Sequence, residues 1–233
     1  MIVLCKEVHS SEFCKDTSCN ICFIVVKVSN VNERVKEIVN LISDNSWLKS
    51  LHPIENVTFA ARSKRTIKKL VEDILLKSDG PISEDLGEYI ISCTAQDILE
   101  SDKNHKKVPL AELLKEKVTG NPGFDFHTET DTQVISFGEA KYNSRANSYG
   151  KALSQIAKFI ELEKDKAEFS ILKHFVSEAA IQNALNGTTA YCAAFSLHSS
   201  NHELIISNIK KSDDLKQLLG NSELYIIGVE ISA

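Results

Sequence analysis

Three residues in the middle of the chain have the types and spacing of a hydrolytic metal site. Asp125 lies in the segment 123–127, and Glu139 and Lys141 follow it in the segment 138–141. Two carboxylates can hold a hard divalent cation, and a neighbouring ammonium group can orient the water molecule that the cation polarises. The pattern therefore indicates metal-assisted hydrolysis.

The segments that carry these residues have the pattern of a β-hairpin. Residues 123–128 and 133–141 are rich in Phe, Val and Ile, and the polar stretch between them suits a turn. A hairpin centred on Thr132 places Asp125 opposite Glu139, with Cβ atoms about 5 Å apart. Glu139 and Lys141 then share a face, because side chains alternate along a strand. Ala140 points the other way, and its backbone carbonyl is expected near the site as a further oxygen ligand.

An exposed hairpin with ordinary surface charges is the alternative interpretation. Phe124, Phe126, Ile135 and Phe137 argue against it, because they predict a strand pair that is buried on at least one face. Charged groups in a mostly buried hairpin usually have partners or a metal ion.

The pattern Asp125…Glu139-Ala140-Lys141 resembles the signature of the PD-(D/E)xK, or restriction-endonuclease-like, nuclease superfamily. Phe124 stands where the superfamily name has proline. The resemblance covers about residues 82–200. It implies an α/β fold whose restriction-endonuclease-like core is a central mixed sheet flanked by helices, in the order helix–strand–strand–strand–helix–strand. It also implies hydrolysis of DNA phosphodiester bonds with Mg²⁺ (or Mn²⁺), in which Asp125, Glu139 and Lys141 act.

Two flanking helices add residues to the expected site. In the superfamily a glutamate of the preceding helix often joins the metal, and Glu88 is the best match, with Glu84 second. Both glutamates can equally serve to complement the dipole of their helix. After the hairpin, Gln155 and Phe159 are similar to the Q-x-x-x-Y element of some branches, with Phe in place of Tyr. This implies that Gln155 contacts a phosphate, although it can also be an ordinary exposed helix residue.

The sequence around the two segments is most similar, within the superfamily, to the HamA-type nucleases of bacterial Hachiman anti-phage defence. That resemblance implies DNA as the substrate and a helicase as the protein partner. Two alternatives stay open. The chain can be a catalytically silent nuclease-fold subunit that binds nucleic acid or a protein partner, or the motif can be accidental in a partner-binding α/β protein. The complete Asp/Glu/Lys set favours an active enzyme.

The composition is that of a soluble globular protein. The chain has 233 residues, of which 42% are hydrophobic and 25% charged. No apolar run approaches about 18 residues, and the start lacks the features of a secretory signal. We therefore expect no contact with a membrane and a cytoplasmic location. The net charge of −5 argues against a large electrostatic footprint on nucleic acid, although a bound cation changes the local sign.

Two basic clusters and one group of cysteines are further candidates for binding. Either basic cluster can contact a phosphate backbone or form a solvated face. Of the three closely spaced cysteines only the last two have a spacing typical of zinc ligands, so we expect buried thiols rather than a zinc site. The clusters are Arg62, Lys64, Arg65, Lys68 and Lys69; Lys103, His105, Lys106 and Lys107; and Cys14, Cys19 and Cys22.

The turn signal at residues 79–81 divides the chain into two expected units. Residues 1–80 are expected to form an N-terminal α/β subdomain with a basic helix, and residues 81–233 the nuclease core. The expected strands are 21–28, one near 57–60, 123–128, 133–141, 188–197 and 223–231. The expected helices are 31–43, 64–77, 83–101, 109–117, 148–164, 168–186 and 213–219.

Overall fold

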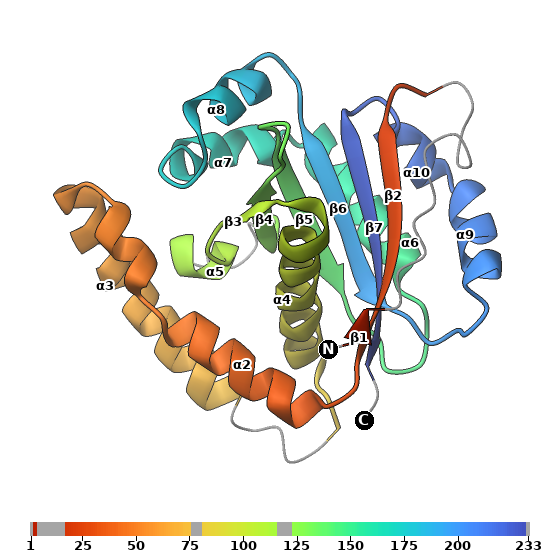
Figure 1. Cartoon of the computed structure of the whole chain (residues 1–233), viewed down its shortest axis with the longest axis horizontal. Coiled ribbons are helices and arrows are strands. Elements are labelled where there is room, and N and C mark those ends of the chain that lie inside the picture. The colour runs from red at the N-terminus through yellow and green to blue at the C-terminus, as the bar shows by residue number, and fades with distance from the viewer. Residues whose placement is uncertain (1, 4–16, 76–80, 116–122, 232–233) are drawn as a thin grey trace.

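The computed structural model describes residues 2–3, 17–75, 81–115 and 123–231, and these form an α/β fold around one mixed sheet (Figure 1). The order of its strands is β1-β2-β7-β6-β5-β4-β3, with β2, β7, β6 and β5 parallel and the others antiparallel at the two edges. The strands are β1 (Ile2–Val3), β2 (Asn20–Val28), β3 (Lys106–Lys107), β4 (Phe126–Glu129), β5 (Ile135–Lys141), β6 (Ala190–Ser196) and β7 (Glu223–Ile231).

The parallel strands form the centre of the sheet because they are apolar on both faces. β6 is buried at every residue, and β2 pairs with β7 in a continuous register from Asn20↔Glu223 to Val28↔Ile231. The segment before residue 80 therefore contributes a strand to the same sheet as the segment after it. The expected division at residues 79–81 does not separate two sheets.

Helices cover both faces of the sheet, as predicted for a mixed α/β protein. α2 and α4 pack on one face, while α6, α8, α9 and α10 contribute to the core on the other. The helices are α2 (Val31–Ser43), α3 (Pro53–Lys69), α4 (Glu84–Lys103), α5 (Ala111–Leu114), α6 (Tyr149–Glu161), α7 (Lys164–Leu172), α8 (Glu178–Leu185), α9 (His202–Lys210) and α10 (Asp213–Leu218), with a 3₁₀ turn η1 (Ser46–Ser50) and a π-helical segment η2 (Leu70–Leu75). Within the described ranges, no helix is both long and apolar enough to cross a membrane.

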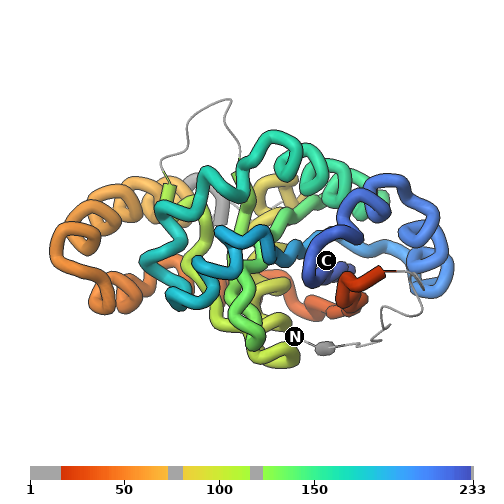
Figure 2. Tube along the Cα trace, turned by 90° about the horizontal axis from the view of Figure 1, so that it is seen from above, coloured from red at the N-terminus to blue at the C-terminus, as the bar shows by residue number. Residues whose placement is uncertain are grey.

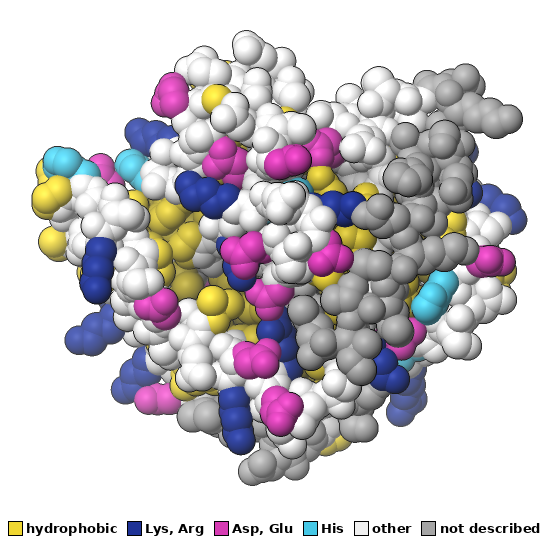
Figure 3. Space-filling model, in the orientation of Figure 1, with side chains coloured by type: hydrophobic (Ala, Val, Ile, Leu, Met, Phe, Trp, Pro, Cys, Tyr) yellow, Lys and Arg dark blue, Asp and Glu magenta, His cyan; other side chains and the backbone are white. Residues whose placement is uncertain are grey.

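α3 extends away from the sheet, at the left of both Figure 1 and Figure 2. The strand expected near 57–60 is wrong, because those residues lie inside this helix. Pro53 occupies its first turn, where a missing N–H is tolerated, and Phe59 and Ser63 are buried one turn apart. The basic helix expected at 64–77 is thus the second half of a longer helix. Figure 3 shows hydrophobic side chains at the surface between α3 and α5. A cavity of about 200 Å³ is lined by Leu41 of α2, Trp47 of η1 and Leu113 of α5.

The single helix expected at 168–186 is also wrong, because α7 ends at Leu172 and α8 begins at Glu178. Ser177 causes the new start. Its hydroxyl oxygen accepts a hydrogen bond from the Ala180 amide at 3.2 Å, which caps α8. The same hydroxyl and the Ser177 amide donate to Glu129 at the end of β4, which fixes the break against the sheet.

Candidate active site

The β4–β5 hairpin has the register predicted from its sequence. Phe126 pairs with Gly138 and Glu129 with Ile135, as a hairpin centred on Thr132 predicts. Asp125 lies just before this ladder, and its amide donates a hydrogen bond to the Gly138 carbonyl oxygen at 2.9 Å. The turn closes through a hydrogen bond from the Gln133 amide to the Thr130 carbonyl oxygen at 3.0 Å. Gln133 adopts a φ of 60° there, in the left-handed region that a tight turn requires.

β5 extends past the end of β4, so residues 139–141 form an open edge on that side of the strand. The Asp125 side chain covers this edge, because its Oδ2 atom accepts a hydrogen bond from the Ala140 amide at 2.9 Å. The amide and carbonyl of one strand residue point to the same edge. The Ala140 carbonyl therefore points to the same edge as its amide, while the Ala140 side chain is buried among residues of the α4 layer.

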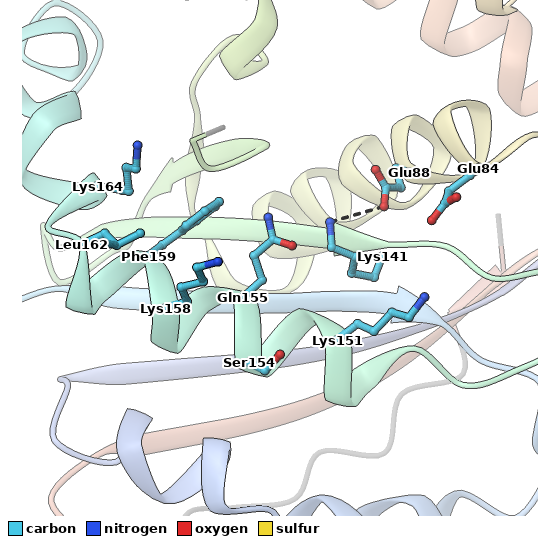
Figure 4. A pocket seen from close by; sticks show the side chains of 10 residues that line it. All are labelled: Glu84, Glu88, Lys141, Lys151, Ser154, Gln155, Lys158, Phe159, Leu162 and Lys164. Carbon is cyan, nitrogen blue, oxygen red and sulfur yellow. Dashed lines mark hydrogen bonds and ion pairs between the residues drawn. The ribbon is translucent and has the colours of Figure 1, made fainter. Parts of the chain in front are cut away.

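Glu139 and Lys141 lie together, as the alternation of the strand predicts. The Lys141 Nζ atom is 2.6 Å from Glu139 Oε1 and 3.4 Å from Glu88 Oε1 (Figure 4 shows the second contact). Glu139 is only 1% exposed. Its second oxygen, Oε2, is buried and has no hydrogen-bond partner among the described residues.

Burial and mutual repulsion shift the protonation of the carboxylates. Burial, and then the nearby Asp125, raise the pKa of Glu139 well above its usual value, although Lys141 opposes this. Burial also raises the pKa values of Asp125 and Glu88 against the opposing effect of Lys141. For Lys141, burial alone would lower the pKa, but Glu139 and Asp125 outweigh it, and the pKa is raised. Lys141 therefore keeps its charge at neutral pH.

The oxygen atoms at the open edge suit a hard divalent cation. Glu139 Oε2 is an orphaned buried acceptor, and the Asp125 carboxylate and the Ala140 carbonyl face the same edge. The described part of the chain contains no group of three or more His, Cys, Asp or Glu side chains that can hold a metal ion. Glu88, the expected third carboxylate, has its Oε1 atom 3.4 Å from Lys141 Nζ. The residues fit an ion such as Mg²⁺, which one or two carboxylates can bind while it keeps several water ligands.

Gln155 lies on α6, where it lines a cleft of about 650 Å³ beside Lys141 (Figure 4). Glu84 and Glu88 of α4 line the same cleft. The fold therefore brings Lys141, Gln155 and both glutamates around one opening. Asp125 lines a smaller adjoining cleft of about 70 Å³, which Glu88 also lines. The two clefts therefore meet at Glu88.

α4 is held close to the end of β5 by a contact that the sequence did not reveal. The ring of Tyr142 packs directly on Gly87, where any Cβ atom would collide with it. Ser83, predicted to cap this helix, does so through the Leu86 amide at 3.2 Å. Together they fix Glu88 beside Lys141.

A buried ionic cluster supports the strand that leads to Asp125. Glu168 of α7 accepts a hydrogen bond from the Phe124 amide at 3.2 Å and pairs with His127 Nε2 at 2.5 Å and with Lys115. His127 and Lys115 lower the pKa of Glu168 although burial opposes them. His127 is fully buried, so it serves this cluster and does not line the cleft. The spacing of Glu168 in the sequence gave no signal for this role.

The two basic clusters differ in their surroundings. Lys64, Arg65, Lys68 and Lys69 are exposed on α3, and the Arg62 guanidinium lies 5.8 Å from the centre of the Phe59 ring. In the second cluster, His105 is buried, and Lys107 pairs with Asp97 at 2.9 Å and with Glu100 at 2.6 Å. The second cluster therefore contributes to the structure around α4 more than to a free basic surface.

Cys19 and Cys22, the two members of the cysteine group that the structure describes, lie on opposite sides of the sheet. Cys19 is buried in the core on the α6 side of the sheet, whereas Cys22 packs against the core on the α4 side. Both are free thiols. Cys14, the third predicted candidate, lies outside the described residues.

Comparisons with known proteins do not assign the chain to a family. No protein-family model matches its sequence, and no curated protein matches it either.

Proposed function

We propose that the protein is a metal-dependent nuclease that hydrolyses phosphodiester bonds at the open edge of β5. The observation that carries the proposal is the convergence of Asp125, Glu139 and Lys141, with Glu139 Oε2 buried and unpartnered. A buried carboxylate oxygen without a partner costs stability, and a cation at this position would relieve that cost.

The arrangement of elements supports a restriction-endonuclease-like core. From α4 to β6, the described elements run helix, the three strands β3, β4 and β5, then the helices α6, α7 and α8 and a strand, with the short α5 between β3 and β4. The resemblance implies the order helix–strand–strand–strand–helix–strand, and this chain adds α5 within the strands and two further helices before β6. Asp125 directly precedes the second of these strands, and Glu139 and Lys141 stand on the third.

The residues divide the chemistry between them. Asp125, Glu139 and the Ala140 carbonyl would hold Mg²⁺ or Mn²⁺, which when bound would polarise the phosphodiester and lower the pKa of a bound water. Lys141 stays protonated because of its carboxylate neighbours, so it offsets negative charge on the reacting phosphate and does not act as a base. Its second neighbour, Glu88, limits where the ammonium group can lie. Gln155 is placed to contact the phosphate from α6.

Cleavage of labelled DNA tests the proposal. Wild-type protein with Mg²⁺ or Mn²⁺ should cleave, EDTA should abolish cleavage, and Glu139→Gln and Lys141→Gln should each reduce the rate at least 100-fold. Glu161→Gln, an exposed substitution at the end of α6, is the matched control and should leave the rate unchanged. Equal cleavage by the wild type and both site variants, or no Mn²⁺ binding to the wild type by calorimetry, would overturn the proposal.

The narrower resemblance to HamA-type nucleases extends the proposal to anti-phage defence in the cytoplasm with a helicase partner. It rests on the residues around Asp125 and Glu139 alone. Stimulation of cleavage by a co-purified, ATP-hydrolysing helicase would support it, and an ATP-independent rate that no partner changes would count against it.

A further inference from the structure

The cleft beside Lys141 has walls of opposite charge (Figure 4). Lys151 and Lys158 of α6 line one wall, and Glu84 and Glu88 of α4 line the other. α4 and α6 cover opposite faces of the sheet, so the cleft opens around the edge of β5 that β4 leaves uncovered. A ligand that contacts Lys141 in this cleft meets both walls.

The cationic wall is a row of side chains on one face of α6. Lys151 and Lys158 are seven residues apart, which places them two turns and about 10 Å apart along the helix. Both are exposed, and neither forms an ion pair within the part of the chain that the structure describes. The opposite face of α6, including Leu153 and Ile156, is fully buried in the core. The orientation of the row toward the cleft is therefore fixed by packing.

The acidic wall continues beyond the cleft itself. Glu88 also lines the smaller adjoining cleft, together with Asp85, Glu112 and Asp125. This concentration of carboxylates disfavours a second phosphate backbone on the α4 side, because like charges at short range repel. A duplex carries phosphates on both flanks, whereas a single strand carries one backbone and exposes its bases on the other side. Base amino groups can donate hydrogen bonds to carboxylates.

We propose that this cleft binds a single strand of nucleic acid, with phosphates along Lys151 and Lys158 and bases toward Glu84 on α4. This inference rests on the proposed nuclease function of the site, and it specifies that the substrate is single-stranded rather than duplex nucleic acid. The protein then needs only a short cationic row for binding, which agrees with its net charge of −5. Duplex interfaces, by contrast, are large and strongly positive.

Binding can be measured apart from cleavage. Fluorescence anisotropy in EDTA, with Glu139→Gln protein, compares a labelled 12-nucleotide DNA strand with the duplex of the same sequence. The single strand should bind at least tenfold more tightly. Each phosphate contact contributes about 0.7 to the slope of log K against log salt for single strands. Lys151→Gln and Lys158→Gln should therefore each reduce the magnitude of the slope by about 0.7 and weaken binding several-fold.

Two controls separate this surface from other basic regions. Lys173→Gln, an exposed lysine after α7, and the pair Lys64→Gln and Lys68→Gln on α3 should leave the slope unchanged. Tighter binding of the duplex, or a slope that responds to the α3 pair and not to the α6 lysines, would overturn the inference. Lysine-dependent strand binding without cleavage by the wild type in Mn²⁺ would overturn the nuclease proposal and leave this binding mode standing. Cleavage by the wild type together with equal affinity for single-stranded and duplex DNA would overturn the single-strand inference and leave the nuclease proposal standing.

Discussion

Replacement of Glu139 by glutamine should stabilise the metal-free protein, although it removes the central residue of the candidate site. Glu139 is 1% exposed, and its Oε2 atom has no partner among the described residues. An unsatisfied buried acceptor costs about 1–3 kcal/mol. In the variant, the amide oxygen can keep the contact with Lys141, and the amide NH₂ group can donate toward Asp125, whose charge is close enough to raise the pKa of Glu139. We expect a gain of about 1–3 kcal/mol in the free energy of unfolding at pH 7.

The difference between the two proteins should depend on pH. Burial and Asp125 raise the pKa of Glu139 above the ordinary glutamate value of 4.5, so the native state binds this proton more tightly than the unfolded chain does. By linkage, Glu139 lowers the stability of the wild type as pH rises from about 4.5 toward the raised native pKa. The variant lacks this titration. Its advantage should therefore grow across that window and stay constant above it.

Urea unfolding in EDTA between pH 4.5 and 8 measures this difference, with Glu161→Gln as the exposed control. Mg²⁺ at ten times its Kd should then stabilise the wild type by about 1.4 kcal/mol and leave Glu139→Gln unchanged. A variant that is less stable than the wild type in EDTA at pH 7 would refute the account of the orphaned oxygen. An equal Mg²⁺ gain in both proteins would refute the role of Glu139 as a ligand.

Three further predictions concern the framework of the site. Gly87→Ala should destabilise the protein by about 1–3 kcal/mol in urea unfolding, because the new methyl group collides with the Tyr142 ring. Gly150→Ala in α6 is the control. Its methyl group meets no atom within 4 Å, so the substitution should be neutral or stabilising. Glu168→Gln should cost about 3–5 kcal/mol, because it breaks a buried ionic cluster; a loss below 1 kcal/mol would contradict that role. Burial lowers the pKa of His105 to about 4, so its NMR signals should not shift between pH 8 and 5.5. The His105 contribution to stability is complete above about pH 6.5 and should decline as pH falls from there toward 4.

The hairpin could be predicted in detail because its information is local. The alternation of apolar residues and a polar centre at Thr132 determine both the faces and the register, and a shift by one residue would have turned Glu139 into the opposite layer. The Ser83 cap and strands such as β2 and β7 were predictable for the same reason. Each depends on a pattern among residues that are close together in the sequence.

The supports of the site were not predictable, because they join segments far apart in the sequence. Glu168 binds the Phe124 amide from 44 residues away, and Gly87 meets the Tyr142 ring across the interface between α4 and β5. The sequence around Glu168 and around Gly87 contains no pattern that indicates either distant partner. The expected strand near 57–60 failed for another reason. Val57 and Phe59 favour strands by type, but Phe59 and Ser63 are buried at helical spacing once the helix packs.

The contact between Glu139 and Lys141 is compatible with a bound cation, and the geometry of the glutamate shows why. Lys141 contacts only Oε1, and Oε2 remains buried and unpartnered on the same carboxylate. One carboxylate can therefore bind the ammonium group with one oxygen and a cation with the other, without breaking the ion pair. Burial is the largest cause of the raised pKa values of Glu139, Asp125 and Glu88, and Lys141 opposes each shift. When ionised, these three carboxylates carry more negative charge than the single ammonium group of Lys141 can offset. A divalent cation would remove that excess, and the arriving phosphate would then meet a site whose net charge no longer repels it.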